Sequence, residues 1–107
     1  LGTDSAPHPR SAKESSCGCA GIFNALNAIE IYAEVFEEEG SLEKLEGFSS
    51  EFGPRFYGLP LNNSSISLVR KSQIVKESME VRYSESFVEK IIPFQSGKCL
   101  NWTVEIE

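Results

Sequence analysis

The residues best suited to chemistry lie in the first 21 positions of the sequence. Asp4 follows Leu1-Gly2-Thr3, a run that can end a β-strand, and His8, the only histidine, follows four residues later. Barrel enzymes place catalytic groups at the C-terminal ends of their strands. A carboxylate beside an activated water can relay its proton, and an imidazole N–H can bind a carboxylate. We therefore take this stretch as the candidate site.

Each of these residue types also has an ordinary structural explanation. An aspartate within Thr-Asp-Ser-Ala-Pro commonly makes a turn or a cap, and a lone histidine between two prolines is commonly an exposed surface residue. Arg10 and Lys13 add positive charge that could attract an anionic substrate, although solvated charge is the usual role of such residues. Taken one at a time, these residues leave both interpretations open.

Cys17 and Cys19 stand one residue apart in the same loop, a spacing unfavourable for a disulfide between them. The odd total of three cysteines favours a reducing compartment. Zinc sites generally separate their cysteines by two to four residues and need further ligands. We expect these thiols to pack under the loop, as small apolar side chains do, and not to bind metal.

Longer stretches of the chain resemble the C-terminal part of dihydroorotases of the bacterial and plant type, within the metal-dependent amidohydrolase superfamily. Five segments carry the resemblance and follow one another in the family's order. They are GTDSAPH (residues 2–8), KESSCGCAGIFNA (13–25), FGPRFYGLPLN (52–62), LVRK (68–71) and IPFQSGKCLNW (92–102). Leu26, where members often have proline, and a longer linker at residues 79–86 depart from the family pattern.

The resemblance implies roles for three residues. Asp4 would ligate one metal of a binuclear Zn²⁺ centre and act as the catalytic general base, moving a proton from the attacking hydroxide to the leaving ring nitrogen. His8 would bind the free carboxylate of the substrate, and Ala20 would bind substrate through its backbone. The implied reaction interconverts N-carbamoyl-L-aspartate and dihydroorotate in pyrimidine (UMP) biosynthesis.

The resemblance also implies an α/β fold, the C-terminal segment of a TIM (β/α)8 barrel with a small β-rich tail. Such barrels need about 250 residues, whereas the chain has 107. We expect residues 1–61 to supply the last barrel strand, the active-site loop and two helices, and residues 62–107 to form an extension beside the barrel. Most zinc ligands would lie outside the chain, so we expect it to be inactive alone.

Composition narrows the class of partner. The net charge of −6 comes from 16 acidic and 10 basic residues, and no basic patch is present, so nucleic acid is not an expected partner. The longest apolar run is too short to span a membrane. We expect an intracellular protein, in the cytoplasm or in a mitochondrion or plastid for a plant source. It would bind a small-molecule substrate, with a homodimer possible for the whole enzyme.

Hydrophobic periodicity predicts the elements that position the site. A helical stripe (Ile22, Leu26, Ile29, Ala33, Phe36) predicts an amphipathic helix that ends near Gly40. A second helix is expected from a cap at Ser41 to a stop at Gly53-Pro54, followed by an ordered loop. Period-two segments predict strands after residue 64, most clearly over residues 100–106, while residues 77–86 are expected to be a flexible connection.

Two other functions remain open at this point. The chain could be a non-catalytic piece that acts as an interaction or structural module. It could also belong to a dihydropyrimidinase-like amidohydrolase, although GTDSAPH and SSCGCAG argue against that family.

Overall fold

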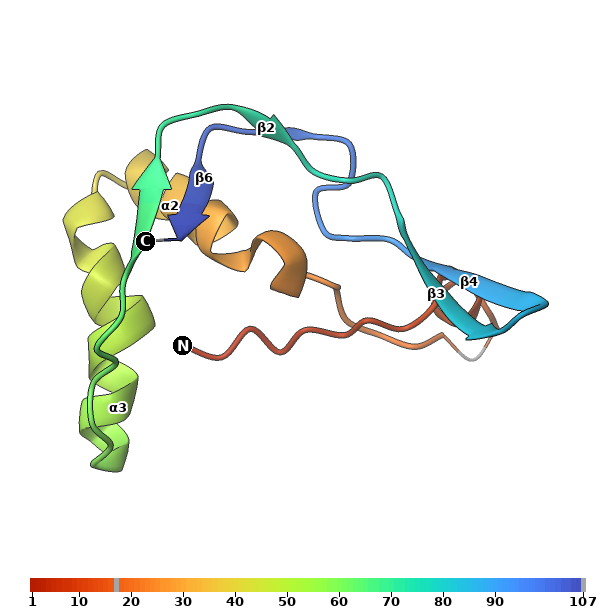
Figure 1. Ribbon diagram of the computed structural model, residues 1–107, viewed down its shortest axis with the longest axis horizontal. Helices are drawn as coiled ribbons and strands as arrows, with labels where there is room; N and C mark the ends of the chain where they lie inside the picture. The colour runs from red at the N-terminus through yellow and green to blue at the C-terminus, as the bar shows by residue number, and fades with distance from the viewer. Residues whose placement is uncertain (17, 107) are drawn as a thin grey trace. The chain divides into compact units, whose positions relative to one another are not determined.

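The computed structural model describes residues 1–16 and 18–106 (Figure 1). The chain divides into two compact units, each built from separate segments. The first unit contains Leu1–Gly2, Ala28–Gln73 and the chain from Leu100 onward. The second contains Thr3–Asn27 and Ile74–Cys99. Helix and strand are both present, as expected for an α/β protein.

The 3₁₀ turn η1 (Ala25–Asn27) precedes helix α2 (Ala28–Glu38) along the chain. The first unit is built around α2 and the three short helical segments that follow it. These segments are η2 (Leu42–Lys44), the π-helical turn η3 (Gly47–Glu51) and α3 (Phe52–Tyr57). The core contains Ala33, Leu45 and Trp102, which are 0%, 7% and 8% exposed. Half-buried apolar side chains surround this core.

The predicted amphipathic helix is confirmed over most of its length. Ile29 and Phe36 pack around buried Ala33, as the predicted stripe requires. The helix ends because Gly40 adopts a left-handed conformation with φ of +66°. The Ser41 N–H then donates to the Phe36 carbonyl at 2.8 Å, a bond that closes the C-terminal turn. The helix begins later than the stripe predicts, since Ile22 lies in the preceding loop and is exposed.

The second predicted helix begins where expected, after Ser41, but it is divided into η2, η3 and α3 and ends later than predicted. The Ser41 side chain makes no cap hydrogen bond. Pro54 lies inside α3 instead of ending it, and the helix stops at Gly58, which has φ of +67°. Proline is tolerated in the first turn of a helix, where its missing N–H has little consequence. The π-helical turn before α3 supplies the change of helical register that the periodicity could not reveal.

Strands β1 (Ile66–Val69) and β6 (Thr103–Ile106) form an antiparallel pair in the first unit, with Leu68 opposite Val104. The predicted alternation over residues 100–106 is thus confirmed in part: Leu100 and Trp102 are buried, whereas Ile106 is 86% exposed. The side chain of Gln73 donates to the Trp102 carbonyl at 2.7 Å and that of Thr103 donates to the Lys71 carbonyl at 2.8 Å. These two bonds hold the chain that follows β1 against the start of β6.

The second unit contains an antiparallel hairpin of β3 (Met79–Ser84) and β4 (Phe87–Ile91). The prediction of a flexible connection at residues 77–86 is therefore wrong. Strand β3 alternates apolar and polar residues, and cross-strand partners stabilise it: Glu80 faces Lys90, and the Tyr83 and Phe87 rings lie 5.6 Å apart. The two-residue strands β2 (Gln73–Ile74) and β5 (Cys99–Leu100) form another pair.

Leu1–Thr3, predicted to end a barrel strand, has no strand assignment in the structure. A strand is defined by hydrogen bonds to its neighbours, and among the described residues none pairs with this segment as a strand. The barrel strand therefore stays a prediction. No helix in the described part of the chain is long and apolar enough to cross a bilayer.

Candidate active-site loop

The three predicted site residues all lie in the second unit, on the loop Thr3–Asn27. The loop contains the short helix α1 (Arg10–Lys13) and turns back so that its two ends run side by side. The Ala6 N–H donates to the Ile22 carbonyl at 2.7 Å and joins these ends. Gly21, with φ of +99°, makes the close approach possible, because a Cβ there would lie 2.7 Å from the Cβ of Ala6.

Residues from the C-terminal segment of the second unit, Ile74–Cys99, support this loop. Phe23 forms a parallel bridge with Pro93, and the Phe94 N–H donates to the Phe23 carbonyl at 2.7 Å. The Ser11 hydroxyl donates to the Glu89 carboxylate on β4 at 3.0 Å. The hairpin that was expected to be flexible therefore braces the candidate active-site loop.

Asp4 is exposed and has φ of +49°, in the left-handed region. Aspartate tolerates this conformation better than most residues, although it still has a cost. Its carboxylate forms no ion pair or hydrogen bond with residues 1–16 or 18–106. A solvent-facing carboxylate without a partner among these residues is available to a metal ion or a substrate proton.

His8 and Ala20 are also exposed, and the described part of the loop shows no hydrogen bond that joins either of them to Asp4. Ala20 is fixed from both sides. The N–H of Cys19 before it donates to the Ala12 carbonyl at 3.2 Å, and the carbonyl of Gly21 after it accepts from the Lys13 ammonium at 2.9 Å. The loop thus carries all three predicted residues and leaves Ala20 exposed.

The two basic side chains of the loop have structural partners. Lys13 binds the Gly21 carbonyl, which holds the loop closed but leaves the ammonium charge uncompensated. Arg10 pairs with Glu14 at 3.1 Å, one turn along the chain, and both side chains are exposed. Lys13 is therefore the cation of this loop whose charge no carboxylate offsets in the described structure.

Sequence reasoning missed Asn24 and Ser5, which join the two ends of the loop. The Asn24 side chain donates from Nδ2 to the Thr3 carbonyl at 3.0 Å. The Ser5 hydroxyl accepts from the N–H groups of Asn24 at 3.3 Å and Ala25 at 3.2 Å, at the start of η1. Their sequence separation gives no periodic signal, so only an Asn immediately before a helical turn could have suggested a structural role.

Of the two loop cysteines, the structure describes Cys19. Cys19 is half-buried and is not in a disulfide, while Cys17 lies outside the described residues. Within residues 1–16 and 18–106, no group of three or more His, Cys, Asp or Glu side chains is placed to hold a metal ion. Asp4 fits zinc as one oxygen ligand, and further ligands would have to come from other residues.

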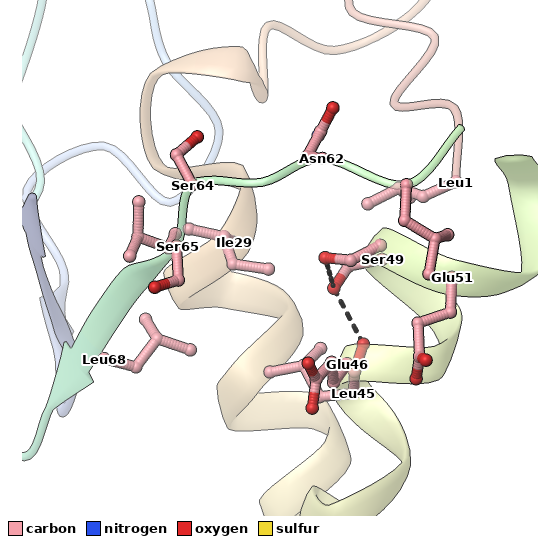
Figure 2. Close-up of a pocket in the computed structure, with 13 residues that line it drawn as sticks. Leu1, Ile29, Leu45, Glu46, Ser49, Glu51, Asn62, Ser64, Ser65 and Leu68 are labelled. Atoms are coloured by element: carbon pink, nitrogen blue, oxygen red, sulfur yellow. Dashed lines mark hydrogen bonds between the residues drawn. The ribbon is translucent and has the colours of Figure 1, made fainter. Parts of the chain in front are cut away.

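A pocket of about 660 Å³ lies in the first unit, and none of the three predicted site residues lines it (Figure 2). Its wall combines apolar side chains such as Ile29 and Leu68 with serine hydroxyls, and Glu46 and Glu51 are its charged residues. Without a lining cation, this pocket is poorly suited to an anionic ligand. The exposed loop is the better candidate site.

Comparison with known proteins identifies relatives that share more than half of their residues with this chain over the matched part. No protein-family model matches the chain. A dihydroorotase of Acinetobacter baumannii is 55% identical over 102 residues, which are 95% of this chain and 28% of that protein. A dihydroorotase of Neisseria gonorrhoeae is 54% identical over 105 residues, 98% of this chain and 29% of that protein. The chain thus spans less than a third of the length of these relatives.

Solved structures give the same result. The crystal structure of dihydroorotase from Saccharomyces cerevisiae in complex with 5-fluoroorotic acid matches all of this chain and 30% of its own, with a TM-score of 0.84 and 37% identity. A dihydroorotase structure from Campylobacter jejuni matches 98% of this chain and 29% of its own, with a TM-score of 0.77 and 29% identity. In sequence and in backbone, this chain matches the C-terminal portion of dihydroorotases.

Proposed function

We propose that the chain is the C-terminal part of a zinc-dependent dihydroorotase, a cyclic amide hydrolase that interconverts N-carbamoyl-L-aspartate and (S)-dihydroorotate in pyrimidine biosynthesis. The 55% identity over 95% of the chain carries this proposal. The fold around it would be a TIM barrel, with Leu1–Thr3 in its last strand. The division at residues 61 and 62, the homodimer and the cellular compartment stay predictions of the same kind.

Asp4 would be both a metal ligand and the general base. Zinc, when bound, lowers the pKa of a water molecule and polarises a carbonyl group. Asp4 would accept the proton from the nucleophile and return it to the ring nitrogen as the amide C–N bond breaks. An exposed carboxylate without a partner among the described residues supports this role, because no bond within the described chain must break first.

His8 and Ala20 would bind the substrate. An imidazole N–H of His8 would donate to the free carboxylate of dihydroorotate. The backbone of Ala20 would contact the ring or the carboxylate, and its small side chain would let the ligand approach. The uncompensated charge of Lys13 favours anions at the same loop. 5-Fluoroorotic acid, held by the yeast relative, is likewise a pyrimidine carboxylic acid.

A segment exchange tests the proposal. This chain replaces the matching 102 residues of the Acinetobacter baumannii dihydroorotase, and turnover of dihydroorotate is measured. We expect activity, and we expect Asp4→Asn to lower kcat by roughly 10²- to 10⁴-fold, the usual contribution of a general base. Glu14→Gln, the same change of charge in the same loop, is the control. A folded, zinc-loaded hybrid that does not turn over dihydroorotate would contradict the proposal.

The same hybrid separates the two other functions. Hydrolysis of hydantoins in preference to dihydroorotate would indicate a dihydropyrimidinase-like enzyme. A native protein of only this mass and without zinc, found by mass spectrometry and metal analysis in the source organism, would favour a non-catalytic interaction module. For the 107-residue chain alone we expect no measurable turnover, because one aspartate and one histidine cannot hold two zinc ions.

A further inference from the structure

The direction of the Asp4 carboxylate depends on its backbone. The described side chains give Asp4 no hydrogen-bond or ion-pair partner, so no neighbouring group holds the carboxylate in place. Its φ of +49° lies in a region that non-glycine residues rarely occupy. Such a conformation persists only where the surrounding structure enforces it. Some neighbouring contact must therefore hold the backbone at Asp4.

Asn24 makes that contact on both sides of Asp4. Its Nδ2 donates to the carbonyl of Thr3 at 3.0 Å, and its main-chain N–H donates to the hydroxyl of Ser5 at 3.3 Å. Thr3 and Ser5 are the residues immediately before and after Asp4. The first bond holds the peptide unit between Thr3 and Asp4, and the second holds the side chain of the residue that follows Asp4. The bond between Ala6 and Ile22 extends the same contact.

The side chain of Asn24 is poorly explained by packing alone. Its Oδ1 is buried and has no hydrogen-bond partner in the described structure. Burying an unpaired amide oxygen opposes folding, and an apolar side chain of similar volume would avoid that cost. Turning the amide over would place an oxygen against the Thr3 carbonyl, so the observed donor must face Thr3. The donor is the feature that an apolar residue could not supply.

We propose that Asn24 is a positioning residue that aims the carboxylate of Asp4 by bonding to Thr3 and Ser5. The inference rests on the role given to Asp4 under the proposed function. It requires Asn24 to act through its N–H donors without touching metal or substrate. Loss of the Nδ2 donor frees the backbone at Asp4, and a displacement of about 1 Å at a reacting group costs up to roughly a hundredfold in rate.

The test uses the full-length enzyme with residues numbered as here. Asn24→Leu keeps the volume and removes the unpaired oxygen, and Asn24→Asp keeps the shape and removes the Nδ2 donor. For both variants we expect kcat to fall by roughly ten- to a hundredfold, KM to stay within about twofold, and zinc affinity, measured by competition with a chelator, to fall. Asn24→Leu removes the unpaired oxygen but also leaves the Thr3 carbonyl without its donor, and these two effects oppose each other, so its melting temperature should stay close to that of the unmodified enzyme.

Asn27→Ala is the matched control, because Asn27 lies three residues further on and its side chain makes no hydrogen bond in the part of the chain that the structure describes. It should leave kcat, KM and zinc affinity unchanged. Ser5→Ala, which removes one oxygen, should reproduce the kcat effect of the Asn24 variants. Normal kcat in Asn24→Leu and Asn24→Asp overturns the inference, and so does a collapse of melting temperature in both, which would make Asn24 a purely structural residue.

Asp4→Asn distinguishes failure of this inference from failure of the proposed function. If Asp4→Asn loses turnover while the Asn24 variants keep it, only the positioning role is wrong. If Asp4→Asn keeps both turnover and zinc affinity, the function given to Asp4 is wrong and the positioning role falls with it.

Discussion

At the residue scale, the candidate site depends on a few exposed polar groups presented by a braced loop. Asp4, His8 and Ala20 all face solvent, while the bonds that hold the loop run between half-buried Thr3, Ser5 and Asn24. The residues predicted to react or bind substrate are thus separate from the residues whose bonds hold the loop. Substitutions in the two sets should therefore have different kinetic effects.

The role given to His8 predicts a change in substrate binding. In the full-length enzyme, His8→Ala removes a donor to the substrate carboxylate, and hydrogen bonds to charged groups contribute about 1.5–3 kcal/mol. We expect KM for dihydroorotate to rise by roughly tenfold or more, with a smaller change in kcat. His8→Gln keeps an N–H donor and should recover part of the loss. Steady-state kinetics with unchanged KM in both variants would contradict the assignment.

Gly21 predicts a change in stability. A Cβ there would meet the Cβ of Ala6 at 2.7 Å, and φ of +99° disfavours any side chain. We expect Gly21→Ala to lower the free energy of unfolding by about 1–3 kcal/mol and to reduce turnover by displacing the loop. Gly2→Ala is the control, because a Cβ at Gly2 meets no atom within 4 Å. Equal denaturation midpoints for the two variants would contradict this account.

At the element scale, an ion pair links α2 to the residue after β1. The guanidinium of Arg70 donates to both carboxylate oxygens of Glu37 and lies 4.5 Å above the ring of Trp102. The hydrogen bond and charge of Arg70 lower the pKa of Glu37 below its ordinary value of 4.5 and raise the pKa of Arg70. The pair thus anchors the helix to the segment that covers the core tryptophan.

This ion pair predicts a pH-dependent difference in stability. Since the folded state depresses the pKa of Glu37, the stabilisation is fully present above the ordinary pKa of about 4.5 and is lost as pH falls through the folded value. Glu37→Gln should lower the melting temperature at pH 7, and the difference should vanish in acid. Glu38→Gln, on the exposed face of α2, should show no such dependence. A difference that persists in strong acid would rule out this explanation.

The sequence predicted the elements whose signal is local. The stripe at Ile29, Ala33 and Phe36 and the glycine at position 40 are local patterns, and they predicted the body and the C-terminal end of α2 correctly. The π-helical turn before Pro54 was missed because it shifts the helical period within a few residues. Strand β3 was missed because its alternation is short and mostly exposed, so its order depends on pairing with β4.

The site was predictable only through resemblance. Neither Asp4 nor His8 stands out from ordinary turn residues by type or spacing, and only the surrounding GTDSAPH gave them roles. Those roles stay predictions. Asn24 could not be found in this way, because its contacts with Thr3 and Ser5 exist only once the loop has closed.

At the scale of the whole molecule, much apolar surface is exposed. In the first unit, Phe52, Phe56, Tyr57 and Leu59 are all more than 60% exposed, and Phe56 reaches 82%. Exposed patches of this kind drive association in water. We therefore expect the isolated 107-residue chain to self-associate, with sedimentation velocity showing larger species as concentration rises. The double variant Phe52→Ser/Phe56→Ser should reduce this, and a strictly monomeric unmodified chain would contradict it.

The division of the chain into interleaved units also sets the order in which the molecule can be built during synthesis. Ser11 meets Glu89, 78 positions later, and β1 meets its partner strand only at Thr103–Ile106. As the polypeptide leaves the ribosome, the loop with Asp4 emerges before β4 and has no brace from that strand until it follows. The candidate catalytic groups would thus be made before the strand that braces their loop, and a nascent chain that stalls before β4 would carry them on an unbraced loop.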